Sequence, residues 1–72
     1  MVDLDLHRVP HSKAVELAEE FILTESQNFG FSCRIITGNS LELQKKIIEK
    51  VIKKHKFNYL IPNHNLGIII VS

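Results

Sequence analysis

The chain has 72 residues, of which 44% are hydrophobic and 24% are charged, and its formal net charge at pH 7 is +1. This length fits one domain, residues 1–72, near the lower limit for a hydrophobic core without further support. The single cysteine, Cys33, excludes an internal disulfide framework and a multi-cysteine zinc site. The apolar runs are too short to cross a bilayer and the first residues are acidic, so we expect a soluble cytoplasmic domain without a secretory signal.

Residues 2–7 predict the first strand, because apolar side chains alternate with Asp3, Asp5 and His7. An ordinary half-buried strand would carry Thr, Ser or Lys on its polar face. Here Asp5 stands where it can orient or charge-stabilise the His7 imidazole. Arg8 and the residues after it end the strand, so His7 lies at its C-terminal end, where open α/β sheets bind ligands.

A helix is predicted to follow the first strand. Pro10 suits a first helical turn, and apolar residues recur at three- and four-residue steps over 14–22. We expect this helix to fade near Gly30, which can adopt a left-handed conformation. Residues 31–36 predict the second strand, which ends in a turn at 37–40.

The second half of the chain predicts a helix and a hairpin. The helix covers residues 41–54, with Asn39 as its N-cap and Glu42 as the capping-box partner. Residues 57–61 and 67–71 predict two strands that a short turn-rich loop joins.

The order strand-helix-strand-helix-strand-strand limits the fold. Right-handed crossovers make the first three strands parallel, and the hairpin makes the last strand antiparallel to them. Both helices then cover one face of the sheet. We therefore expect an α/β chain of the α+β two-layer type, with a four-stranded mixed sheet. The last strand is apolar on both faces and is expected at a central position.

Charge is unevenly distributed along the chain. Residues 37–72 carry six lysines against two glutamates, whereas residues 1–36 carry an excess of acidic side chains. Most of the lysines, Lys45 among them, lie in the second predicted helix. Such a run is typical of a solvated helix face, and it also suits a polyanion such as RNA or DNA.

Two predicted loops should meet at one edge of the sheet. If the first two strands are adjacent, His7 lies beside the turn at 37–40. Gly38 would let the backbone of this turn approach a ligand closely, and the amides that open the second helix favour an anion. A phosphodiester held there would face His7. The residues expected to bind it are Arg8, Arg34, Thr37, Gly38, Asn39, Ser40 and Lys45.

The segments Leu4-Asp5-Leu6-His7 and Thr37-Gly38-Asn39-Ser40 resemble the two motifs of the Smr (small MutS-related) domain, LDLH and HGxG or TGxG. The first motif matches completely. In the second, Ser40 stands where the final glycine is expected. Arg8 also replaces the glycine that usually follows the histidine.

The resemblance implies a strand order of 1-2-4-3, as in the C-terminal domain of bacterial translation initiation factor three. It further implies an endonuclease that cleaves RNA, including mRNA on ribosomes, or nicks structured DNA. By position, Asp5 and His7 correspond to the residues held to matter for cleavage. Thr37, Gly38 and Asn39 correspond to the turn that contacts the substrate.

Residue chemistry gives His7 a role as general base or acid, with Asp5 as its partner and the RNA 2′-hydroxyl as internal nucleophile. A divalent metal held by Asp3, Asp5 and His7 stays an alternative, but three ligands at every second residue of one strand are too widely spread for compact coordination, so no cofactor is expected. The remaining histidines, His11, His55 and His64, are expected at the surface or in packing.

Two other functions remain open. One is an RNA- or DNA-binding module of the same fold without catalysis, since a fold does not by itself carry an activity. The other is a protein-interaction factor that docks through the open face of the sheet.

Overall fold

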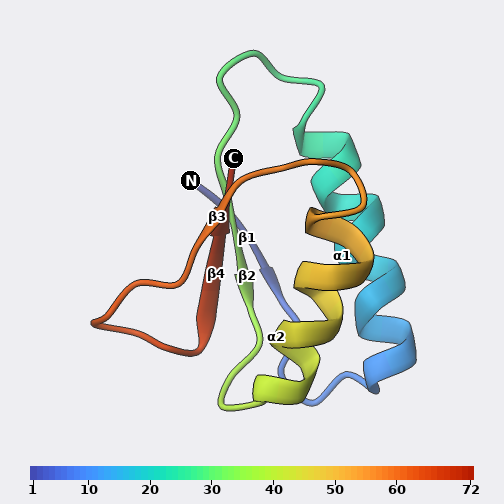
Figure 1. Ribbon diagram of the computed structural model, residues 1–72, viewed down its shortest axis with the longest axis vertical. Helices are drawn as coiled ribbons and strands as arrows, with labels where there is room; N and C mark the ends of the chain where they lie inside the picture. The colour runs from blue at the N-terminus through green and yellow to red at the C-terminus, as the bar shows by residue number, and fades with distance from the viewer.

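The computed structural model describes residues 1–72 as one four-stranded sheet with two helices on the same side of it (Figure 1). The strands are β1 (Val2–Asp5), β2 (Cys33–Ile36), β3 (Tyr59–Leu60) and β4 (Ile68–Val71). The helices are α1 (His11–Glu25) and α2 (Leu41–Ile47), and a π-helical segment, η1 (Ile48–Ile52), continues α2. The strand order is β1-β2-β4-β3. The predicted two-layer α+β fold and its strand order 1-2-4-3 are therefore confirmed.

The pairing of the strands also follows the prediction. β1 runs parallel to β2, and β4 runs antiparallel to both β2 and β3. β4 is thus central, as its apolar side chains on both faces predict, and Ile69 and Val71 are completely buried. The sheet exposes its other face, where Leu60 of β3 is 60% exposed.

The core lies between the sheet and the helices. Small residues of α1, Ala14 and Ala18, let the helix approach the sheet closely, and Ile22 fills the space above them. Aliphatic side chains of β2, β4, α2 and η1 complete the layer. The buried core residues are Leu6, Ala14, Ala18, Ile22, Cys33, Ile35, Leu43, Ile47, Val51, Ile52, Ile69 and Val71. Burial raises the pKa of the Cys33 thiol to about 11, so this cysteine is a packing residue.

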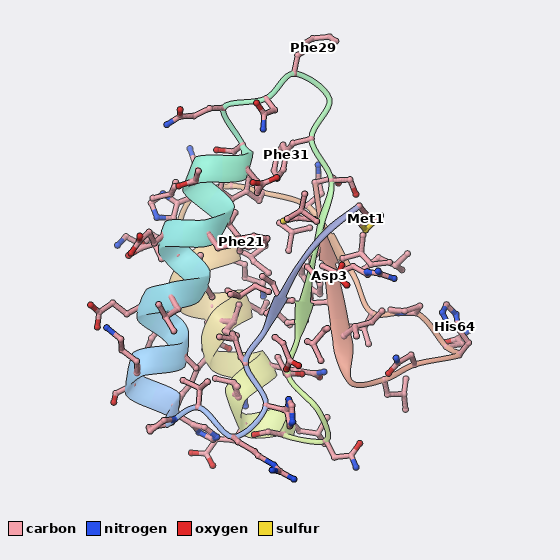
Figure 2. The ribbon with its side chains drawn as sticks, turned by 180° about the vertical axis from the view of Figure 1, so that it is seen from behind. Met1, Asp3, Phe21, Phe29, Phe31 and His64 are labelled. Atoms are coloured by element: carbon pink, nitrogen blue, oxygen red, sulfur yellow. The ribbon has the colours of Figure 1, made fainter.

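Helix α1 ends at Glu25, earlier than predicted. Thr24 and Ser26 hydrogen-bond through their side chains to backbone carbonyls of the preceding turn, which competes with regular helix geometry. Turn-type backbone bonds carry the chain on to Asn28. Gly30 has a φ of +69°, the left-handed conformation predicted for it. The loop then presents Phe29 fully to solvent, away from the sheet (Figure 2).

Helix α2 begins at Leu41, as predicted, but its capping residue differs from the prediction. Asn39 is not the N-cap, and the prediction was wrong, because Leu41 is the first helical residue and Ser40 therefore occupies the capping position. The Ser40 hydroxyl accepts a hydrogen bond from the Leu43 amide at 3.2 Å. From Ile48 the helix widens to π geometry instead of continuing as an α-helix to residue 54.

Helix α1 is tied to the end of the second helical segment by a polar contact. The Glu19 carboxylate contacts His55 Nε2 at 2.7 Å and Lys54 Nζ at 3.3 Å. Hydrogen bonds from these two side chains, that from His55 above all, lower the pKa of Glu19.

Neither helix has the length and apolar character that a membrane crossing requires.

Two residues other than glycine have a positive φ, Arg8 at 70° and Lys56 at 62°. We expect Arg8→Gly to be more stable than Arg8→Ala by about 0.5–1 kcal/mol in free energy of unfolding. A Cβ is strained in this conformation, and its removal outweighs the greater backbone freedom of glycine in the unfolded chain. Urea unfolding at constant slope measures the difference.

Lys56→Gly and Lys56→Ala form the matched pair for this comparison and should differ in the same direction. If the glycine variants at both positions unfold at a lower urea concentration than the alanine variants, the backbone at these residues is not strained by a Cβ.

Candidate active site

The C-terminal ends of β1 and β2 lie level with each other. Asp5 pairs with Ile36 in the parallel register, and the Leu6 amide donates to the Ile36 carbonyl at 2.8 Å. The connection after β1 and the turn after β2 therefore start side by side. A Cβ placed on Gly38 would lie 3.6 Å from the Cβ of His7. The predicted meeting of His7 with the turn at 37–40 is confirmed.

Asp5 and His7 form a hydrogen-bonded pair at this edge. Asp5 Oδ1 lies 2.6 Å from His7 Nδ1 and also accepts the backbone amide of His7 at 3.1 Å. The bond from the His7 side chain, and then that from its backbone, lower the pKa of Asp5 below 3.8. Asp5 is therefore an ionised acceptor at neutral pH, which assigns the proton of the imidazole to Nδ1.

The other ring nitrogen of His7, Nε2, has no hydrogen-bond partner in the protein. The His7 side chain is 53% exposed and the Asp5 side chain 51% exposed. An imidazole held at Nδ1 by a carboxylate has a lone pair on Nε2 that can take a proton from a ligand. The pair has the arrangement of a general base and its orienting carboxylate.

The turn after β2 is held from the interior. Thr37 is only 3% exposed, and its hydroxyl contacts the Gly67 carbonyl at 3.1 Å. The Gly67 carbonyl also accepts the amides of Thr37 and Gly38, at 2.8 and 3.1 Å. Thr37 thus supports the turn rather than presenting its hydroxyl at the surface. The Gly38 amide is likewise occupied by this carbonyl.

Gln44 completes this support and was not predicted as part of the site. It is 4% exposed and donates its side-chain amide to Thr37 Oγ1 at 2.9 Å and to the Leu66 carbonyl at 2.6 Å. The feature of the sequence that indicates it is a polar residue on the apolar side of the second predicted helix, four residues after Ser40. Gln44 joins three segments: the turn, α2 and the β3–β4 connection.

The remaining predicted contact residues lie in four different places. Asn39 and Ser40 lie in the turn, Asn39 exposed and Ser40 partly buried, and Arg8 is exposed directly after His7. Lys45 is exposed on α2. Arg34 lies on the open face of the sheet, level with Asp3 and two residues before the end of β1.

Arg34 makes two hydrogen bonds to the Asp3 carboxylate, at 2.8 and 3.0 Å. The bonded carboxylate raises the pKa of the Arg34 guanidinium. The Asp3 carboxylate thus balances the Arg34 charge (Asp3 is labelled in Figure 2). Of the two predicted arginines, only Arg8 carries a charge that no carboxylate of the protein pairs with.

The pair of Asp5 and His7 stands on an open edge rather than in a pocket. The surface depression of the molecule lies between β1 and α1 and is lined by Leu4, Leu17, Glu20, Phe21 and Thr24. No group of three or more His, Cys, Asp or Glu side chains is placed to hold a metal ion. Comparisons with known proteins returned no matching family model, no similar curated protein and no similar solved structure.

Replacing Gln44 by leucine tests the interior support of the turn. Leucine has a similar volume but cannot donate, so the buried Thr37 hydroxyl and the Leu66 carbonyl both lose a hydrogen-bond donor. We expect Gln44→Leu to lower the free energy of unfolding by about 1–3 kcal/mol, measured by urea unfolding. The neighbouring exposed Lys45→Leu is the control and should change it by less than about 0.5 kcal/mol. Equal stability of Gln44→Leu and wild type would contradict a structural role of these bonds.

The titration of Asp5 tests the hydrogen-bonded pair. Because its folded pKa lies below the unfolded value near 3.8, Asp5 adds stability above that pH, and this stability is lost as the pH falls through the folded pKa. In His7→Ala the Asp5 pKa should rise toward 3.8, and the acid dependence of thermal stability should weaken. Carboxyl-detected NMR measures the pKa, with His64→Ala as control. An unchanged Asp5 pKa in His7→Ala would rule out the bond in solution.

Proposed function

We propose that the protein is a cytoplasmic endonuclease of the Smr type that cleaves RNA, or nicks structured DNA, by acid–base chemistry without a cofactor. One observation carries this proposal. The ionised Asp5 carboxylate holds the half-exposed His7 imidazole by Nδ1, Nε2 has no partner in the protein, and the Cβ of His7 lies where a Cβ on Gly38 would be 3.6 Å away. Ribosome-bound mRNA belongs to the candidate substrates.

In the proposed reaction on RNA, His7 Nε2 accepts the proton of a 2′-hydroxyl; DNA lacks this group, so nicking of DNA would need a water as the nucleophile instead. The 2′-oxygen attacks the adjacent phosphorus, and the bond from phosphorus to O5′ breaks, which leaves a 2′,3′-cyclic phosphate and an O5′ that takes up a proton to become a 5′-hydroxyl. Asp5 keeps the imidazole in the reactive tautomer and stabilises the imidazolium that forms. Arg8, directly next to His7 and without a carboxylate partner, offsets the charge on the phosphate oxygens.

Backbone geometry supports the resemblance at the residue where the sequence departs from the first motif. Arg8 has a φ of 70°, a conformation that glycine adopts without strain, and the family motif carries glycine at this position. Gly38, which matches the second motif, has a φ of 67°. Both turns beside His7 therefore have the backbone shape that the glycines of the motifs would allow.

Exposed lysines favour a nucleic-acid partner for either the nuclease or the binding module. Lys45, Lys50 and Lys53 are exposed and form no ion pair, whereas Lys46 and Lys54 pair with Glu42 and Glu19. Unpaired lysines on a helix that starts at the candidate site can contact the phosphate backbone on either side of a bound nucleotide. Binding through them should weaken steeply with salt.

The test is cleavage of end-labelled RNA and branched DNA by wild type and His7→Ala. We expect wild type to cleave RNA and His7→Ala to be slower by about 10²–10⁴-fold, because the general base is lost. RNA with a 2′-deoxy substitution at the cleaved position should stay intact. His64→Ala, at the tip of the β3–β4 connection (Figure 2), is the control and should cleave at the wild-type rate.

The same assay separates the alternatives. Equal cleavage by wild type and His7→Ala would exclude the catalytic role of His7. Intact RNA recovered from a salt-sensitive complex would instead establish the non-catalytic binding module.

A further inference from the structure

A second histidine contacts the turn at the candidate active site. His11 is the first residue of α1, and its Nε2 lies 3.3 Å from the Ser40 hydroxyl. The side chain is partly buried and forms no ion pair with a carboxylate. The sequence predicts His11 at the surface or in packing, so its contact with a residue of the site is a finding of the structure.

The two imidazoles flank one short turn. A Cβ on Gly38 would lie 3.6 Å from the Cβ of His7, and His11 contacts Ser40, two residues further along. Two residues of extended chain span at most about 7 Å. Figure 1 shows both helices beginning at the same end of the molecule, next to the connection from β1. A phosphodiester bound at the turn would therefore lie between a group that accepts a proton and a group that donates one.

The hydrogen bonds of Ser40 determine where its own proton can go. A hydroxyl has two lone pairs and one hydrogen. One lone pair accepts the Leu43 amide at 3.2 Å. When His11 carries a proton on Nε2, this proton occupies the second lone pair. The hydroxyl hydrogen must then point to a third partner, and a bound substrate can provide it.

We infer that Ser40 and His11 supply the acid side of the reaction, an inference that rests on the proposed ribonuclease function. His7 takes the 2′-hydroxyl proton as the bond from O2′ to phosphorus forms. As the bond from phosphorus to O5′ breaks, O5′ takes the Ser40 hydroxyl proton, and His11 Nε2 returns a proton to Ser40. Ser40 is then a catalytic residue, and His11 is the residue that positions it and restores its proton. Solvent exchange resets both histidines after release of the products.

The experiment compares two oligonucleotides that differ in one atom. The first has a normal O5′ at the cleaved bond, and the second has sulfur in place of O5′, which leaves as a thiolate without needing a proton. On the oxygen substrate, Ser40→Ala and His11→Asn should lower kcat by about 10²-fold or more. On the sulfur substrate they should stay within about tenfold of wild type, whereas His7→Ala should remain slow on both.

Controls separate chemistry from folding. His64→Asn should behave as wild type on both substrates, and Ser40→Thr, which keeps the hydroxyl, should retain most of the activity. If Ser40→Ala loses the helix cap and unfolds, Ser40→Gly replaces it, since glycine is tolerated at an N-cap at a cost of a few tenths of a kcal/mol.

Each result decides between the two proposals. If His11→Asn and the Ser40 variant lose kcat equally on both substrates, or lose none on either, the acid-side role of these residues is overturned. The proposed nuclease activity would not be affected by that result. Wild type that cleaves neither substrate would overturn the proposed nuclease and this inference with it.

Discussion

The parallel pairing of β1 with β2 determines where every group of the candidate active site lies. Because Asp5 is level with Ile36, the two strands end together and their following loops begin at the same height. This register places the Cβ of His7 where a Cβ on Gly38 would lie 3.6 Å away. A slip of one residue would turn Asp5 and His7 toward the helices and Leu6 toward solvent. Burial of Leu6 therefore maintains the geometry of the pair.

A third segment holds the turn in place. The Gly67 carbonyl accepts the amides of Thr37 and Gly38 and contacts the Thr37 hydroxyl, so the start of β4 holds the turn after β2. A Cβ on Gly67 would come within 3.1 Å of the Gly38 carbonyl oxygen. The close approach of the two backbones thus favours glycine at this position, because a larger residue would have to push the Gly38 carbonyl aside. The site is built on strand ends and bonded loops, with Gln44 joining them from the helix layer.

The sequence predicts the elements and the two-layer fold from periodicity and the handedness of crossovers, whereas the strand order 1-2-4-3 comes from the resemblance to the Smr domain. With the first two strands adjacent, these rules also predict the meeting of His7 with the turn at 37–40. They do not specify which way a side chain of a turn points. The interior position of the Thr37 hydroxyl and the contact of His11 with Ser40 therefore follow only from the three-dimensional structure. For the same reason the sequence did not decide between Asn39 and Ser40 as the N-cap, since either side chain can accept a hydrogen bond from the first turn of the helix. Membership of the Smr family stays a prediction based on the two motifs.

β1 forms an edge of the sheet, since it is hydrogen-bonded to β2 alone. Edge segments open locally at a lower free energy than the central strands that hold the core. Brief detachment of β1 would separate Asp5 and His7 from the turn while β2 and β4 stay paired. The candidate catalytic machinery therefore has a thermal limit of its own, which lies below the melting temperature of the protein as a whole.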